Sequence, residues 1–139
     1  MTIFVDTWGW LALADPRDAC HSEAAECYRE YGKRVGGVVT SNFVLDETFT
    51  LLFRRRPFEE ALRFSAGLLE SQYIRIESVT EQRFKRAYEL RRRFFDKPRI
   101  SFTDLSSMAV MMELKIFDIL TGDEHFSQVG LGLRRIPAR

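Results

Sequence analysis

Short apolar runs alternate along the chain with longer segments in which apolar residues recur every three or four positions. The runs have the length of buried strands, and the periodic segments have the length of helices that cover a sheet with one face. Strands are predicted at residues 2–6, 38–40, 73–77, 116–121 and 134–136, and helices at 7–13, 18–31, 41–53, 58–70, 81–95 and 102–114. This alternation predicts a three-layer α/β domain with a mostly parallel sheet.

The chain has no internal repeat, low-complexity tract or long linker, and its 139 residues are enough to bury a core. We therefore expect one domain that spans residues 1–139. Hydrophobic residues make up 45% and charged residues 29%, which is typical of a globular protein. No apolar stretch reaches the roughly eighteen residues of a membrane span, and the amino terminus lacks the basic region of a signal peptide. A cytoplasmic protein without a membrane segment is expected.

The formal net charge is only +1, so the total charge does not indicate nucleic-acid binding. The distribution is more informative, because 17 of the 21 basic residues are arginines and several of these are consecutive. Arginine suits two-point recognition of phosphate or carboxylate groups better than lysine does. Taken alone, the clusters fit ordinary solvated helix faces better than a binding site. They lie at Arg54-Arg55-Arg56, Arg91-Arg92-Arg93 and Arg134-Arg135.

Two aspartates follow predicted strands directly. Asp6 ends the first apolar run, and Asp123 comes just after the strand predicted at 116–121. In a parallel sheet, ligands bind at the carboxyl ends of the strands, above all where the strand order reverses. If these two strands are neighbours, both carboxylates face one crevice. Capping of the following turn or helix is an equally good explanation for either aspartate alone.

Two further acids stand at helix positions. Glu47 shares a helical face with Phe43, Val44 and Leu51, which we expect to face the core, and an ionised side chain there is costly unless it is paired or binds a metal. The alternative is a side chain at the edge of that face that reaches solvent. Asp104 is the third residue after Ser101, a position that serves a helix cap adequately by itself.

The four acids are more informative together than singly, because they come from separate segments and each could reach the same edge of the sheet. Two like charges about 5 Å apart repel by roughly 3 kcal/mol at an effective dielectric constant near 20. A fold that gathers several of them therefore needs a cation. Oxygen ligands alone suit Mg²⁺ or Mn²⁺ rather than zinc. Such an ion can activate water against a phosphate group.

The cysteines and histidines suggest no independent site. Cys20 and Cys27 lack zinc-ligand spacing and are expected to be small buried thiols rather than a disulfide. His21 is expected to pack or to lie at the surface. His125, two residues after Asp123, could approach a phosphate, but a role in stabilising the turn fits better.

In four segments the chain resembles the PIN-domain ribonucleases, and most of all the toxin half of VapBC-type toxin–antitoxin pairs. No single segment is specific, but their order and spacing are, and the resemblance covers nearly the whole chain. The segments are Ile3-Phe4-Val5-Asp6-Thr7, residues 40–48 (TSNFVLDET), residues 101–107 (SFTDLSS) and residues 120–126 (LTGDEHF).

The resemblance implies a five-stranded parallel sheet flanked by helices and RNA cleavage that depends on Mg²⁺ or Mn²⁺. It also implies a homodimer and an antitoxin that covers the site. Gly122 departs from the bulkier residue that is common at its position. Residue by residue, it implies that the catalytic and metal-binding acids are Asp6, Glu47, Asp104 and Asp123, with Thr7 and Thr121 as supporting hydroxyl groups.

The working hypothesis is a metal-dependent endoribonuclease, with RNA guided by Arg91, Arg92, Arg93 or Arg99. A haloacid-dehalogenase-like phosphatase would need an acid two places after Asp6, where Trp8 stands. A catalytically idle domain that binds RNA or another protein remains the alternative. Seven phenylalanines on the predicted helices are expected either to pack the core or to form a partner surface; they are Phe49, Phe53, Phe58, Phe64, Phe84, Phe94 and Phe95.

Overall fold

The computed structural model describes residues 1–137 of the chain. Strands and helices alternate through this part. The strands are β1 (Ile3–Val5), β2 (Val38–Ser41), β3 (Ile74–Glu77), β4 (Asp118–Leu120) and β5 (Arg134–Ile136). The helices are α1 (Thr7–Ala14), α2 (His21–Tyr31), α3 (Asn42–Arg55), α4 (Phe58–Glu70), α5 (Glu81–Arg93), α6 (Phe102–Leu114) and α7 (His125–Gln128).

The strands form one sheet in the order β3-β2-β1-β4-β5, and every pair of neighbours is parallel. The chain moves outward from β1 to β3 and then returns to place β4 on the other side of β1. The strand order therefore reverses between β1 and β4, which is where ligands bind in open α/β sheets. Val5 lies opposite Leu120, so Asp6 and Thr121 leave the two strands at the same level.

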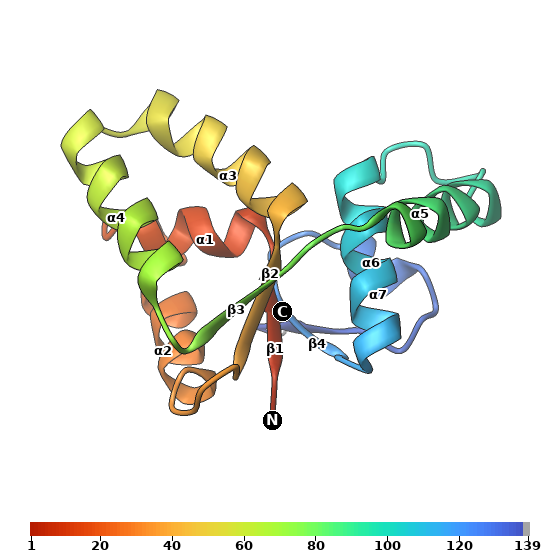
Figure 1. Ribbon diagram of the computed structural model, residues 1–139, viewed down its shortest axis with the longest axis horizontal. Coiled ribbons are helices and arrows are strands. Elements are labelled where there is room, and N and C mark those ends of the chain that lie inside the picture. Colours follow the sequence, from red (N-terminus) through yellow and green to blue (C-terminus); the bar gives the residue numbers. More distant parts are fainter. Residues whose placement is uncertain (138–139) are drawn as a thin grey trace.

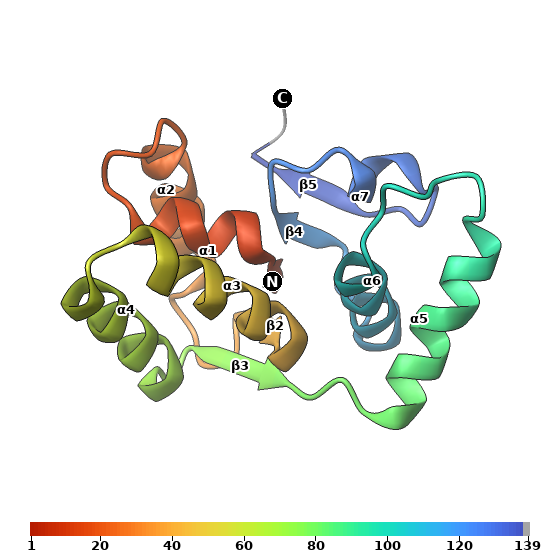
Figure 2. The same cartoon turned by 90° about the horizontal axis from the view of Figure 1, so that it is seen from above.

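Helices cover both faces of the sheet, with α1 to α4 on one side and α5 to α7 on the other (Figure 1). The prediction of a three-layer domain with a five-stranded parallel sheet is therefore confirmed. Figure 2 shows the two groups of helices from above, with β4 between them. None of the helices within residues 1–137 is long and apolar enough to cross a membrane.

Local chemistry explains where the central elements begin and end. All three residues of β1 are buried, as expected of a central parallel strand. The Ser41 hydroxyl oxygen accepts a hydrogen bond of 3.2 Å from the Val44 amide and so caps α3. Helix α6 ends at Leu114, because the next residue, Lys115, has a left-handed backbone conformation with a φ of 56°.

A buried tryptophan fixes α1 on the sheet. Trp10 is 2% exposed, and its indole N–H donates to Thr40 Oγ1 at 3.1 Å. The Thr40 hydroxyl donates in turn to the Val5 carbonyl oxygen at 2.9 Å. This chain of hydrogen bonds joins α1, β2 and β1, so the helix that follows Asp6 has a defined orientation.

Several predicted ends differ from the structure by a few residues. The helix predicted at 18–31 begins at His21, because the Asp18 carboxylate accepts from the Cys20 amide at 2.8 Å and holds a turn there. The helix predicted at 81–95 ends at Arg93, and the strand predicted at 116–121 is shorter at both ends. Helix α7 was not predicted, since four residues are too few to show a period.

Only three of the seven phenylalanines pack the core. Phe94 is buried, and Phe49 and Phe64 pack against the core. Four others remain exposed on α3 to α5 and in the loop after α5: Phe53, Phe58, Phe84 and Phe95. Cys20 and Cys27 are not joined by a disulfide, and both are half buried rather than buried as expected.

Candidate active site and metal centre

Asp6 lies at the end of β1 and is held from two sides. Its Oδ1 accepts from the Gly9 amide at 3.0 Å, which caps α1, and its Oδ2 accepts from the Thr121 hydroxyl at 2.6 Å. The side chain is almost completely buried. Burial raises the pKa of Asp6 to about 7. The two hydrogen bonds lower this pKa, and the nearby charges of Asp104 and Asp123 raise it.

Asp123 lies in the turn after β4, where Thr121 connects it to Asp6. The Thr121 hydroxyl oxygen accepts a hydrogen bond of 3.0 Å from the Asp123 amide, and the same hydroxyl group donates a hydrogen bond to Asp6. Asp123 Oδ1 accepts from the His125 amide at 2.8 Å. The strand-end acid is therefore both a turn residue and a neighbour of Asp6, so the two explanations of its position are compatible.

Asp104 comes from α6, on the other side of the sheet edge. Its amide donates to the Ser101 hydroxyl oxygen at 3.0 Å, as the predicted cap requires. Burial raises the pKa of its carboxyl group, and the charge of Asp123 raises it further. The amide of Asp104 thus completes the cap that Ser101 forms, while its carboxylate lies within the field of a second carboxylate.

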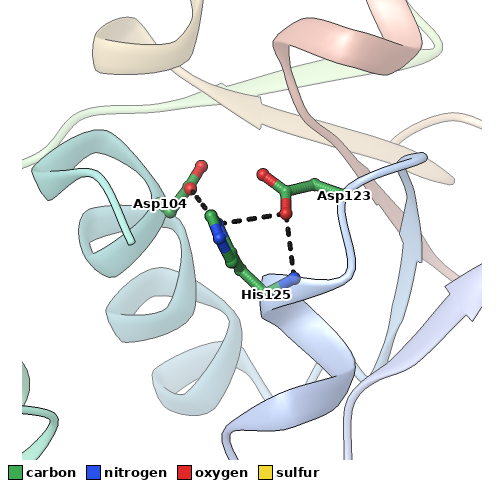
Figure 3. A group of neighbouring side chains, drawn as sticks. All are labelled: Asp104, Asp123 and His125. Carbon is green, nitrogen blue, oxygen red and sulfur yellow. Dashed lines mark hydrogen bonds and ion pairs between the residues drawn. The ribbon is translucent and has the colours of Figure 1, made fainter. Parts of the chain in front are cut away.

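The His125 imidazole lies between Asp104 and Asp123 (Figure 3). Its Nδ1 is 3.0 Å from Asp123 Oδ1 and 3.6 Å from Asp104 Oδ2. Nδ1 is nevertheless buried without a hydrogen bond of acceptable geometry. One nitrogen and two carboxylate oxygens, all within 4.8 Å of one another, form a group that can hold a metal ion.

Glu47 does not lie on the core-facing side of α3, and that expectation was wrong. The buried residues of α3 are Val44, Leu45, Thr48 and Leu52, whereas Glu47 is exposed. The glutamate still reaches the cavity described below, from the edge of the helix. Thr7, the other supporting hydroxyl group, donates to the Val44 carbonyl oxygen at 3.4 Å and ties α1 to α3.

All four predicted acids line one cavity of about 270 Å³. We call it the acidic cavity, and its lining residues are Asp6, Thr7, Trp8, Leu11, Val44, Glu47, Thr103, Asp104, Ser107 and Asp123. Its walls come from α1, α3, α6 and the turn after β4. The tertiary fold thus joins segments that are more than a hundred residues apart.

A tryptophan explains the unusual glycine of the fourth motif. A Cβ atom on Gly122 would lie 2.4 Å from Cε2 of Trp8, far inside van der Waals contact. The indole of Trp8 therefore occupies the space that a larger residue at 122 would fill. Trp8 also lines the acidic cavity, so the glycine allows this ring to form part of the wall.

A family model described as "PIN domain" matches residues 3–131, which include every element that carries the acidic cavity. The chain belongs to the PIN-domain family. Among characterised relatives, the 23S rRNA-specific endonuclease VapC20 of Mycobacterium tuberculosis, in strains CDC 1551 and H37Rv, is 38% identical over 128 residues. This match covers 92% of the chain and 94% of VapC20. The resemblance to VapC-type toxins is confirmed.

Solved structures of VapC20 and of two VapBC complexes have the same architecture. The crystal structure of M. tuberculosis VapC20, a sarcin–ricin loop-cleaving toxin, has a TM-score of 0.81 and 36% identity over 96% of this chain and 99% of that one. VapBC2 of Rickettsia felis, bound to promoter DNA, has a TM-score of 0.75 at 15% identity, covering 97% of both chains. DNA-bound VapBC of Salmonella typhimurium has a TM-score of 0.73 at 12% identity, covering 97% and 96%. The last two support the fold alone.

The donor set of this PIN domain fits a divalent cation. Several carboxylates face a common space without a lysine or arginine among the lining residues that the structure describes. Their mutual repulsion, the raised pKa of Asp6 and the unpaired nitrogen of His125 would all be relieved by a cation. Asp104, Asp123 and His125 are placed to hold it.

No role was assigned to Ser107 from the sequence, and a turn-stabilising role was preferred for His125. His125 was expected to stabilise a turn, and its amide does so, but its ring also faces the carboxylates. Ser107 lies one helical turn after Asp104, lines the acidic cavity and has a buried hydroxyl oxygen without a partner. The spacing of three residues between Asp104 and Ser107 was the available signal.

The four arginines expected to guide RNA lie at the end of α5 and in the loop after it. Arg91 is occupied, because its guanidinium donates to backbone carbonyl oxygens of that loop, so we do not carry it forward as an RNA contact. Arg93 lies over the ring of Phe94, 5.2 Å from its centre. Arg92 and Arg99 are exposed.

Proposed function

We propose that this PIN domain is a metal-dependent endoribonuclease that hydrolyses phosphodiester bonds in RNA. One observation carries the proposal: four carboxylates from separate elements line one cavity at the point where the strand order reverses. The similarity to an RNA endonuclease over 92% of the chain supports RNA as the substrate.

The catalytic and metal-binding residues in this proposal are Asp6, Glu47, Asp104 and Asp123, and the ion is Mg²⁺ or Mn²⁺. Carboxylate oxygens dominate the donor set, which these hard cations prefer. When bound, the ion supplies positive charge that polarises the phosphate group of the substrate. His125 offers a nitrogen donor that Mn²⁺ accepts more readily than Mg²⁺ does.

The remaining groups position the acids. The Thr121 hydroxyl directs Asp6 Oδ2, and the Gly9 amide directs Asp6 Oδ1, so this carboxylate has a fixed orientation before substrate arrives. Thr7 holds α1 against α3 through the Val44 carbonyl oxygen and Thr48. Preorganisation of this kind lowers the reorganisation that the reaction requires.

The substrate class and biological role follow from the VapC20-like sequence. We infer that the chain is the toxin of a toxin–antitoxin pair and that it cleaves ribosomal RNA in the cytoplasm, with the sarcin–ricin loop as the first sequence to test. A cognate antitoxin would silence it, and a homodimer is the expected assembly. The 36% identity to VapC20 across 96% of the chain supports this role.

A cleavage assay tests the proposal. Purified protein is incubated with ribosomes and total cellular RNA in Mg²⁺, Mn²⁺ or chelator, and primer extension maps new ends. We expect wild type to cut in Mg²⁺ or Mn²⁺, and neither chelated wild type nor Asp6→Asn to cut. Asp46→Asn, on the exposed side of α3, is the matched control and should retain cleavage. Cleavage that persists in chelator or in Asp6→Asn would overturn the proposal.

A further inference from the structure

A second cavity, linked to the acidic one through His125, has two cationic side chains and one carboxylate in its lining. It has a volume of about 290 Å³ and is formed by the loop after α5 together with α7. We call it the loop cavity, and its lining residues are Asp96, Lys97, Pro98, Arg99, Ile100, His125 and Gln128. The two cavities share no lining residue, but His125 of the loop cavity contacts two residues that line the acidic one.

His125 links the two cavities. Its Nδ1 faces the carboxylates of Asp104 and Asp123, which line the acidic cavity, and the residue itself lines the loop cavity. The loop cavity therefore lies one side chain away from two of the acids. A polymer that places one of its units against these carboxylates could place the neighbouring unit in the loop cavity.

The loop that forms the second cavity is held rigidly by Arg91. Its Nη1 donates to the Ile100 carbonyl oxygen at 2.7 Å, and its Nη2 donates to those of Phe94 and Lys97 at 2.6 and 2.7 Å. The side chain of Ile100 is also buried, which anchors the end of the loop. Three charge-assisted hydrogen bonds on one guanidinium fix the backbone from which Lys97 and Arg99 project.

Two cations project from this fixed loop, and one of them has no partner. Lys97 lies 3.3 Å from the Asp96 carboxylate and near the ring of Phe94. Arg99 is exposed and makes no hydrogen bond or ion pair with any residue among 1–137. Gln128, also exposed, adds an amide donor to the same cavity. The cavity thus presents a free guanidinium and further N–H donors, which suit an anion.

An RNA substrate needs such a group here. Each RNA phosphate is negative, whereas the acidic cavity has carboxylates and no lysine or arginine among its described lining residues. A cation bound there offsets the repulsion at one phosphate only. Cations placed just outside the acidic cavity would attract the flanking phosphates, and Arg99 and Lys97 line the loop cavity together with His125.

We propose that the loop cavity is a phosphate-binding subsite, in which Arg99, assisted by Lys97 and Gln128, holds an RNA backbone phosphate next to the one that is cleaved. This inference depends on the proposed ribonuclease function and extends it. Because the contact is to the backbone, it fixes the position of the strand rather than reading its sequence. It replaces the broader expectation that any of four arginines guides RNA.

The first test measures steady-state cleavage of a sarcin–ricin-loop hairpin by Arg99→Ala, Lys97→Ala and the double variant. We expect KM to rise about tenfold for Arg99→Ala, with kcat within about a factor of two, because the contact is made in both ground and transition states. The slope of log(kcat/KM) against log salt should fall by about 0.7 for each cation removed. Arg99→Lys should restore part of the loss.

The control is Lys33→Ala, which removes one exposed cation from the turn before β2, at the opposite edge of the sheet. It should leave KM and the salt slope unchanged. Melting temperatures of all variants should match wild type, since Lys97 and Arg99 project from the surface. Equal effects of Lys33→Ala and Arg99→Ala would overturn the proposal, because the loss would then reflect net charge alone.

The second test neutralises the substrate instead of the protein. Once the wild-type cut is mapped, each flanking phosphate is replaced in turn by a neutral methylphosphonate on a 2′-O-methyl nucleotide, with the 2′-O-methyl phosphate as its control. At one flanking position, the methylphosphonate should weaken cleavage by wild type as much as Arg99→Ala does. The same methylphosphonate should not weaken cleavage by Arg99→Ala any further. Additive losses at every position would refute the subsite. An inactive wild type would instead refute the ribonuclease function itself.

Discussion

The most specific stability prediction concerns Asp6→Asn in the absence of metal. Burial holds the pKa of Asp6 at about 7, against 3.8 for an ordinary aspartate. At 1.36 kcal/mol for each pKa unit, this difference corresponds to about 4 kcal/mol of lost stability once the group is fully ionised. Relaxation of the cavity and entry of water reduce the loss, so about 2–4 kcal/mol is expected.

The sign follows from the direction of the shift. A carboxyl group whose pKa is raised in the folded protein binds its proton more tightly there than in the unfolded chain. Its contribution to stability is therefore fully present below pH 3.8 and is lost as the pH rises through about 7. Asparagine cannot ionise, yet it keeps an oxygen that can accept from the Gly9 amide and preserve the cap of α1.

The assay is denaturant unfolding of both proteins in chelator at pH 5 and pH 8. Other titrating groups cancel in the difference between variant and wild type. Asp6→Asn should gain about 1–3 kcal/mol relative to wild type on going from pH 5 to pH 8, because the unfolded chain is already mostly ionised at pH 5, and Mn²⁺ at pH 8 should stabilise wild type but not the variant. Asp46→Asn, which is exposed, should show no pH-dependent difference. An Asp6→Asn difference that is the same at both pH values would refute the reasoning.

Three further predictions concern the same site. Asp104→Asn should abolish cleavage while unfolding stability holds or rises, whereas Asp104→Ala should also lose about 0.5–2 kcal/mol; retained cleavage in Asp104→Asn would remove this residue from the site. Gly122→Ala should cost about 1–3 kcal/mol and change the fluorescence of the displaced Trp8; an unchanged emission spectrum and melting temperature would contradict the packing. Thr121→Val removes the hydroxyl that lowers the pKa of Asp6, so the pH at which activity reaches half its maximum should rise; an unshifted pH profile would count against this hydrogen bond.

The sequence was sufficient for the architecture because strand and helix periods alternate clearly. Asp6 and Asp123 follow strands that proved to be neighbours, and parallel strands must present their carboxyl ends at one edge. The short helix α7 lay below the length at which periodicity is detectable. It is also the element that brings His125 to the two carboxylates, so that contact could not be found from sequence spacing.

The side of α3 that faces the core shows a different limit. Phe43 and Leu51 are as apolar as Val44 and Leu52, so a helical wheel alone could not decide which pair lies at the centre of the buried face. Packing against α1 selects the face with Val44 and Thr48, through the Thr7 hydroxyl. Glu47 then lies at the solvent edge of the acidic cavity rather than on the buried stripe.

Arg91 gives a third example, because its role depends on the path of the loop that follows α5. Among consecutive arginines, sequence could not distinguish the one that binds backbone carbonyl oxygens from the ones that remain exposed. The exposed residue that we now propose for RNA binding, Arg99, was one of four candidates. The structure separates it from Arg91 by its position beside His125 and its lack of a partner among residues 1–137.

Metal binding in the acidic cavity is best tested by the anomalous scattering of crystals soaked in Mn²⁺, with data collected above and below the manganese absorption edge. We expect a peak within coordination distance of the carboxylates of Asp6, Asp104 and Asp123, with Glu47 close by, and no such peak in crystals of Asp6→Asn. Manganese bound only elsewhere on the wild-type protein, or an empty acidic cavity at a Mn²⁺ concentration that supports cleavage, would contradict this expectation.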